Sequence, residues 1–197
     1  MRVSRPFRNR GERQRGAALV EMAIILPLLI TLVFGIVEYG LLFKEKLTVA
    51  SSTKSAARTG ATMGTRESAD IRMLEALEAG LFDQVDASVL ISVEIFRADP
   101  VTGAKTGDVN HYSFIPSSVT CKWTPCPDPD EPGYAGFPEP WAPALRDTTL
   151  EPGGGGVDML GIEVTYHHTS ATDLIPGVDR DLHERALIRL EPDVFGM

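Results

Sequence analysis

The sequence predicts an α+β fold: a long N-terminal transmembrane helix, then a small head with a second helix and an antiparallel sheet of about four strands. An apolar run fills residues 17–43, a helical stripe of apolar residues follows, and strict alternation then marks strands. We expect three parts. These are a basic cytoplasmic leader at 1–16, a transmembrane and juxtamembrane helix at 17–64, and an extracytoplasmic α+β head at 65–197.

The charge of the chain changes sign after Gly16. Residues 1–16 hold six arginines and one acid, Glu12, whereas the rest of the chain holds 13 basic and 26 acidic residues. An acidic body disfavours nucleic acid as a partner, because affinity for phosphates comes from clustered Lys and Arg. The basic leader instead fits the positive-inside rule, by which arginine-rich flanks of membrane helices stay cytoplasmic.

The apolar run is long enough to cross a bilayer. The 27 residues from Ala17 to Phe43 would form roughly 40 Å of helix, and a hydrocarbon core of about 30 Å needs about 20 residues. Two acids interrupt the run, Glu21 at its head and Glu38 near its end. Because lipid disfavours a carboxylate, these two residues need an explanation.

Two ordinary interpretations of the run stay open. A secretory signal peptide could be cleaved after Thr48-Val49-Ala50, although its apolar region usually has only about 7–15 residues. An uncleaved single-pass anchor with an extracytoplasmic binding head explains the arginines and the length. It leaves Glu21 as a cost of about 2–3 kcal/mol if that side chain lies deep in the bilayer.

A third interpretation starts from the pattern GAALVE at residues 16–21. It resembles the prepilin motif, in which a membrane aspartyl peptidase cuts directly after the glycine. The resemblance implies that Gly16 is the cleavage-site glycine and Ala17 the mature N-terminus. Glycine suits this position because it lets the chain enter a protease cleft without side-chain obstruction. The Glu21 carboxylate would then pair with the new α-amino group of a neighbouring subunit, and lipid tolerates such a pair better than either charge alone.

The wider stretch RGAALVEMAIILPLLITLVFGIVEYG at residues 15–40 closely resembles the signature of TadE-like proteins, the minor pseudopilins of tight-adherence (Flp-type) pilus systems. The matching positions are Arg15–Ala18, Val20-Glu21, Leu26–Leu28 and Gly35–Gly40. The downstream AARTGA at residues 56–61 is similar to the small-residue helix that follows in that family.

The resemblance implies a single-pass protein of the cytoplasmic (inner) membrane that assists pilus assembly, with its N-terminus inside and a pilin-like head outside the cytoplasm. The implied partners are membrane lipid, a prepilin peptidase, and other pilus assembly proteins and pilins. Homo- or hetero-oligomers would form through the N-terminal helix. The protein would be the substrate of an enzyme and not an enzyme itself.

Two helical segments are expected after the apolar run. Residues 44–64 continue the helix, with Leu47, Ala50, Ala57 and Ala61 near one face whose small side chains allow close approach. Residues 67–82 form a second helix that Ser68 could cap. Its core stripe is Met73, Leu74, Leu77 and Leu81.

The strands are expected in two pairs. Residues 87–98 alternate most clearly, with Val89, Ile91, Val93 and Ile95 on one face, and residues 109–115 return as a hairpin after a turn-rich loop. Strands resume at 157–167 and 184–190. Between the pairs, residues 116–156 are rich in Pro and Gly without periodicity, so we expect a long irregular excursion.

The excursion holds both cysteines and both tryptophans. Cys121 and Cys126 predict a disulfide that pins a loop, if the head lies outside the reducing cytoplasm. Trp123 and Trp141 have two interpretations, a contact surface for a partner or glycan and a separate small core within the excursion.

No pattern points to catalysis or to a cofactor. The four histidines, His111, His167, His168 and His183, lack metal-ligand spacing, and the glycines at 153–156 lack the Lys-Ser/Thr of a phosphate-binding loop. We therefore expect no catalytic, cofactor-binding or metal-binding residues. A secreted or anchored hydrolase, with a cleft that the sequence does not reveal, remains the alternative from another class.

Overall fold

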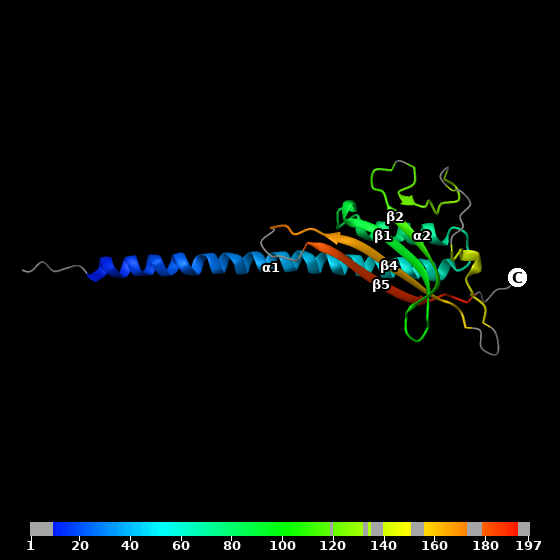
Figure 1. Ribbon diagram of the computed structural model, residues 1–197, viewed down its shortest axis with the longest axis horizontal. Helices are drawn as coiled ribbons and strands as arrows, with labels where there is room; N and C mark the ends of the chain where they lie inside the picture. The colour runs from blue at the N-terminus through cyan, green and yellow to red at the C-terminus, as the bar shows by residue number, and fades with distance from the viewer. Residues whose placement is uncertain are drawn as a thin grey trace, which may run out of the picture.

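The computed structural model describes residues 10–118, 120–131, 134, 140–150, 156–172 and 179–192. It has two α-helices, α1 (Arg10–Met63) and α2 (Ala69–Leu81), in these described parts of the chain. The strands there are β1 (Leu90–Ala98), β2 (Lys105–Phe114), β3 (Trp123–Thr124), β4 (Met159–His168) and β5 (Arg180–Arg189). Two short 3-10 helices are η1 (Ala87–Val89) and η2 (Pro143–Leu145). The long N-terminal half of α1 projects from a head formed by its C-terminal half and the other elements (Figure 1).

The head is a helix pair covered by one antiparallel sheet of order β3-β2-β1-β4-β5 in the described residues. The C-terminal half of α1 packs along α2 and lies against β4 and β5 (Figure 1). The predicted α+β class is confirmed. The four expected strands are all present, and β3, a two-residue strand inside the excursion, adds a fifth at the β2 edge.

The core between helices and sheet follows the predicted periodicities except at the start of β1, where Val89, expected on the strand, lies in η1 instead. Val93 and Ile95 of β1 face the helices, and the whole predicted stripe of α2 packs in the same core. Ile91, expected on the same face of β1 as Val93, is instead partly exposed, and Leu90 is buried in the core. The β1–β4 pairing shifts register between Leu90 and Ser92, which reverses the facing of the residues before the shift.

The second face of the sheet carries its own apolar centre. Phe96 is fully buried there, over Gly161 of β4, where a Cβ atom would lie only 2.3 Å from the Phe96 ring. The charged ends of Lys105 and Arg185 lie 5.1 and 5.3 Å from the ring centroid. Glycine at 161 therefore makes room for an aromatic ring that two cations cover.

Two local expectations about the helices were wrong. Ser68 precedes α2 but makes no side-chain capping hydrogen bond. Leu47, expected on the packed face of the juxtamembrane helix with Ala57 and Ala61, is 69% exposed, whereas those two alanines are buried. The packed face of α1 is formed mostly by small residues, together with Val49, and the small residues let α1 approach α2 and the sheet closely.

Both tryptophans of the excursion belong to the main core, so neither sequence interpretation of them was correct. Trp123 packs on Phe114, with ring centroids 5.0 Å apart, and its indole N–H donates to Glu78 of α2 at 2.7 Å. Trp141 is buried in the same cluster, and its backbone N–H donates to Asn110 of β2 at 2.9 Å. The described part of the excursion thus folds back onto the head.

Candidate assembly site

The first functional feature is the exposed N-terminal half of α1. Its large apolar side chains are all exposed from Leu19 to Val37, and the first fully buried residue along the helix is Glu38. At 1.5 Å per residue the 54 residues of α1 extend about 80 Å. The helix therefore has one half that no part of the described head covers.

Gly16 and Ala17, the residues expected to flank a cleavage site, lie within this exposed half. The helix runs through both without a break, and both are exposed. No atom outside the local helix lies within 4 Å of a Cβ placed on Gly16. Residues 1–9 of the expected leader lie outside the described residues. A glycine in an exposed helix is also a weak point, because it disfavours helix by about 1 kcal/mol relative to alanine.

Glu21 lies one helical turn after Ala17 and is exposed. Its neighbours Leu19, Val20 and Met22 are exposed apolar side chains. Among the residues that the structure describes, Glu21 forms no hydrogen bond or ion pair. Its carboxylate is thus open to a partner from outside the chain, in a surrounding where a lone charge is costly.

Glu38 is in the opposite situation, although it lies on the same helix. It is only 1% exposed, and its carboxylate accepts hydrogen bonds from the Ala171 backbone N–H at 2.7 Å and the Thr172 hydroxyl at 3.0 Å. The Ser170 hydroxyl also hydrogen-bonds to it. These donors directly follow β4, so the carboxylate is satisfied within the chain.

A second contact ties the end of β4 to α1. His168, the last residue of β4, lies 2.7 Å from Glu45 through its Nδ1 atom, and the imidazole is buried. Glu38 and Glu45 are seven residues apart, which is two helical turns. No local sequence pattern indicates either contact, because the two partners of each lie more than 120 positions apart along the chain.

A buried polar cluster links α2 to the excursion. Asp70 accepts hydrogen bonds from Asn110 and from the Tyr112 hydroxyl, both at 2.8 Å, and forms an ion pair with Arg146. The Asp70 and Arg146 side chains are 1% and 0% exposed. Sequence analysis missed this cluster. Because its charged pair is closed to solvent, we interpret it as structural.

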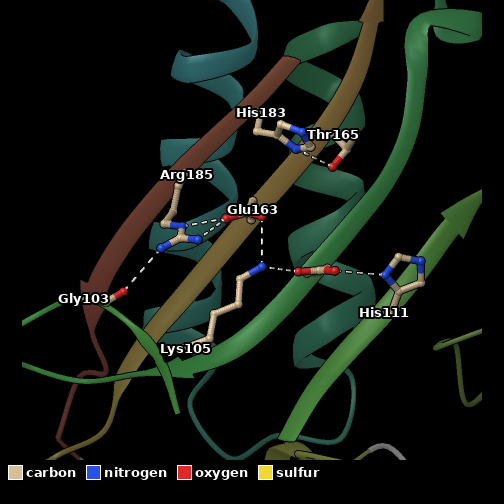
Figure 2. A network of polar contacts seen from close by, with 8 residues as sticks. Gly103, Lys105, His111, Glu163, Thr165, His183 and Arg185 are labelled. Atoms are coloured by element: carbon tan, nitrogen blue, oxygen red, sulfur yellow. Dashed lines mark hydrogen bonds and ion pairs between the residues drawn. The ribbon is translucent and has the colours of Figure 1, made fainter. Parts of the chain in front are cut away.

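The face of the sheet opposite the helices carries a chain of ion pairs (Figure 2). Glu163 accepts from Lys105 at 2.9 Å and from the Arg185 Nε atom at 2.7 Å, and Lys105 also pairs with Glu94. His111 lies 3.4 Å from Glu94, at one end of this row of ion pairs. Burial alone would raise the pKa of Glu163, but hydrogen bonds from the two cations leave that pKa lowered.

These charges neutralise one another and do not converge on a cleft. His183, on the same face, lies 3.0 Å from the Thr165 hydroxyl (Figure 2). Within the part of the chain that the structure describes, no group of three or more His, Cys, Asp or Glu residues could hold a metal ion.

The two cysteines form a disulfide, Cys121–Cys126, as expected from the sequence. Its Cα atoms lie 5.9 Å apart and the bond closes a loop of five positions directly around β3. Cys126 is buried and Cys121 packs against the core. The bond therefore holds the first part of the excursion against the head, next to Trp123.

Comparison with known proteins bears on α1 alone. A family model described as TadE-like protein matches residues 16–61. This range begins at Gly16, includes Glu21 and Glu38, and ends with the small residues that pack in the head. Neither the curated proteins nor the solved structures gave a match. The family resemblance seen in the sequence is confirmed over this segment.

The matched segment also holds the one stretch of the described residues that could cross a membrane. It lies in Gly16–Met63, with a mean hydropathy of 2.6 over its best window, none of which is buried within the protein. Length and composition alone make this assignment. Together with the family match, it supports a membrane-anchored, pilus-related protein.

Proposed function

We propose that this chain is a TadE-like minor pseudopilin, a membrane-anchored component that assists assembly of tight-adherence pili after cleavage behind Gly16 by a prepilin peptidase. The observation that carries the proposal is the exposed Glu21, which has no partner among the described residues and lies five residues after Gly16 on an uncovered apolar helix within the family-matched segment. The chain would be the substrate of the peptidase and would have no enzymatic activity of its own.

The proposed mechanism is assembly by charge pairing in lipid. Cleavage would leave a cationic α-amino group on Ala17, one helical turn from the Glu21 carboxylate. In the membrane the carboxylate of one subunit would pair with the amine of a neighbour, which lowers the cost of placing either charge in lipid. Lateral packing of the exposed apolar helices would follow, with other pilins or with further copies of this chain.

The proposed topology places the leader in the cytoplasm and the head outside the inner membrane. The arginines of residues 1–16 support the inward orientation of the N-terminus. The Cys121–Cys126 disulfide supports a head in an oxidising compartment, since cytoplasmic thiols are kept reduced. In this orientation the head is free to recruit or prime other pilus subunits.

Processing is tested by determining the N-terminal residue of the native protein, by intact-mass measurement and terminal sequencing of a membrane fraction. We expect a start at Ala17, lost when the peptidase is absent and in Gly16→Ala, but kept in the matched variant Gly40→Ala. A start at Met1 or Arg2 would favour the uncleaved envelope anchor with a binding head. A start at Ser51 would mean a secreted domain, and either result would contradict the proposal.

The test of assembly is made at Glu21. We expect Glu21→Ala to be processed and inserted normally but to lose co-purification with pilus components after detergent extraction. Glu21→Asp, which keeps the charge on a shorter side chain, should retain part of this association. Unchanged co-purification of Glu21→Ala would contradict the pairing mechanism.

A further inference from the structure

We propose that the head rests directly on the outer surface of the membrane that α1 spans, and that it meets the lipid headgroups through Thr169–Thr172, the segment after β4 that Glu38 holds. This inference rests on the proposed membrane anchoring of α1. It gives Glu38 a role that differs from that of Glu21.

The depth of Glu38 along α1 is the first argument. It lies 22 residues after Gly16, which is roughly 33 Å of helix. A hydrocarbon core is about 30 Å thick. If the core begins near Gly16, where the leader arginines end, Glu38 lies at the outer boundary between hydrocarbon and headgroups. Tyr39, half exposed beside it, is a residue type enriched at this boundary.

The position of the head is the second argument. The hydrogen bonds from Ala171 and Thr172 bring the end of β4 to the level of Glu38, and the His168–Glu45 contact continues the attachment along the helix. The head therefore begins at the level where the hydrocarbon core ends. Among the described residues, no spacer separates the head from this boundary. Nothing there would hold the head away from the lipid.

The surface of this segment suits a headgroup layer. Thr169 and Ala171 are exposed, and Thr172 is partly buried. On the helix, Leu41 and Phe43 remain exposed beyond Glu38 although they are large and apolar. A mixture of hydroxyl, backbone and apolar groups matches the headgroup and acyl boundary, where both polar and apolar partners are present.

The burial of Glu38 is the third argument. An exposed carboxylate at this depth would meet apolar chains and lose its solvation. The three residues from Ser170 to Thr172 supply its hydrogen bonds in place of water, so the carboxylate and the segment stabilise each other at the boundary. Glu38 thus acts as a positioning residue for the lipid-facing end of the head.

The test measures contact with lipid at three positions in the full chain. Single cysteines at Ala171, Val101 and Val33 would carry an environment-sensitive fluorophore, with the native disulfide kept oxidised, in nanodiscs of phosphatidylcholine and phosphatidylglycerol. Val101, 91% exposed in the turn between β1 and β2 at the other end of the sheet, is the matched control. Lipids spin-labelled on the headgroup or deep in the acyl chain would serve as quenchers.

We expect headgroup-labelled lipid to quench the probe at Ala171 several-fold more than the probe at Val101. Equal quenching at both positions, with strong acyl-chain quenching at Val33, would overturn the inference while α1 still spans the bilayer. Absence of acyl-chain quenching at Val33 would overturn the membrane anchoring itself, and with it this inference.

A second measurement tests Glu38 directly. Glu38→Ala should reduce quenching at Ala171 towards the value at Val101, whereas Glu38→Gln, which can still accept a hydrogen bond from the Ala171 N–H, should retain most of it. Glu75→Ala, a change at an exposed glutamate of α2, serves as the control and should leave quenching unchanged. If Glu38→Ala left the quenching at Ala171 intact, the positioning role would be refuted.

Discussion

The two halves of α1 form one continuous helix in two different surroundings. From Gly16 to Val37 every large apolar side chain is exposed, whereas from Glu38 to Met63 the buried residues are mostly small. The first half carries Leu, Ile, Val and Phe, and the second half buries Ala, Ser and Thr. The comparison shows that large exposed residues mark a helix built for lipid, while small buried ones mark a helix built for close packing.

Two acids of α1, Glu21 and Glu38, show the same contrast. Glu21 in the first half has no partner in the described residues, and Glu38 is enclosed by three donors at the point where the second half begins. A carboxylate that is satisfied within its own chain stabilises a subunit. In the proposed function, one that is not satisfied within the described chain is paired by a second chain. Substitutions should therefore affect folding in the head half and association in the free half.

The largest expected effect lies in the head, at Asp70. Asp70→Ala leaves the Arg146 guanidinium buried without its ion pair and removes the acceptor of Asn110 and Tyr112. Breaking one side of a buried ion pair costs about 3–5 kcal/mol. We expect the free energy of unfolding of the head to fall by that amount in urea denaturation, while membrane insertion of α1 stays normal.

The control for this prediction is two residues away on the same helix. Arg72 pairs with Glu75 at 2.7 Å, but both side chains are about half exposed. Arg72→Ala should leave the urea midpoint essentially unchanged, because exposed ion pairs contribute little. A similar loss for Asp70→Ala and Arg72→Ala would contradict the structural role of the buried cluster.

The second prediction compares two glycines of α1. A Cβ on Gly60 would lie 2.4 Å from the Met73 sulfur and 2.6 Å from Leu160, whereas Gly40 has nothing within 4 Å. Gly60→Leu overpacks the contact among α1, α2 and the sheet and should cost about 3 kcal/mol, at the upper end for overpacking. Gly40→Leu should leave the stability of the head unchanged. Thermal unfolding of both variants in detergent measures the difference in stability, and equal melting temperatures would contradict the prediction.

Local patterns were enough to predict most of the fold. The membrane-spanning part of α1 followed from its apolar run and the rest of that helix from a face of small residues. The second helix, α2, followed from a stripe at helical spacing, and the four longer strands from alternation or from their position between turns. Each of these signals depends on neighbours within a few positions. The family signature that contains Glu21 was equally local, so it too could be found without a structure.

The missing parts depend on contacts between distant residues. Asp70 and Arg146 are 76 positions apart, and Glu38 and Ala171 are 133 apart, so no window of sequence shows that they meet. Trp123 was interpreted as part of an irregular loop because its segment is rich in Pro and Gly, although the ring packs on Phe114. Whether these residues are buried depends on the whole fold, so a local stretch of sequence does not show it.

The third prediction concerns the disulfide of the head. Closing the short loop between Cys121 and Cys126 restricts the unfolded chain and should contribute about 2 kcal/mol in the chain-entropy description. The double variant Cys121→Ser, Cys126→Ser should lower the urea midpoint accordingly, and reduction of the wild-type protein should have the same effect. Reduction should not affect the double variant further. A stability that is unchanged by reduction would show that the loop is held by Trp123 packing alone.

The smallest expected effect is a pH dependence at the end of β4 that faces α1. His167 lies 2.7 Å from Asp181 and 2.9 Å from Asp179. The hydrogen bond from the imidazole to Asp181, with further attraction from Asp179, raises the pKa of His167 above its ordinary value of 6.5. The folded head therefore binds this proton more tightly than the unfolded chain does.

The sign of the pH effect follows from that raised pKa. The contribution of His167 to stability is fully present below about pH 6.5 and is lost as the pH rises through the higher pKa of the folded state. NMR titration of the imidazole should show the raised pKa, and Asp181→Asn should lower it, whereas Asp83→Asn, a change at an exposed acid beyond α2, should not. Because His167 and its partners are exposed, the change in urea midpoint should be slight. A pKa of His167 at or below 6.5 in the wild-type head would mean that the charged pair between β4 and β5 does not form in solution.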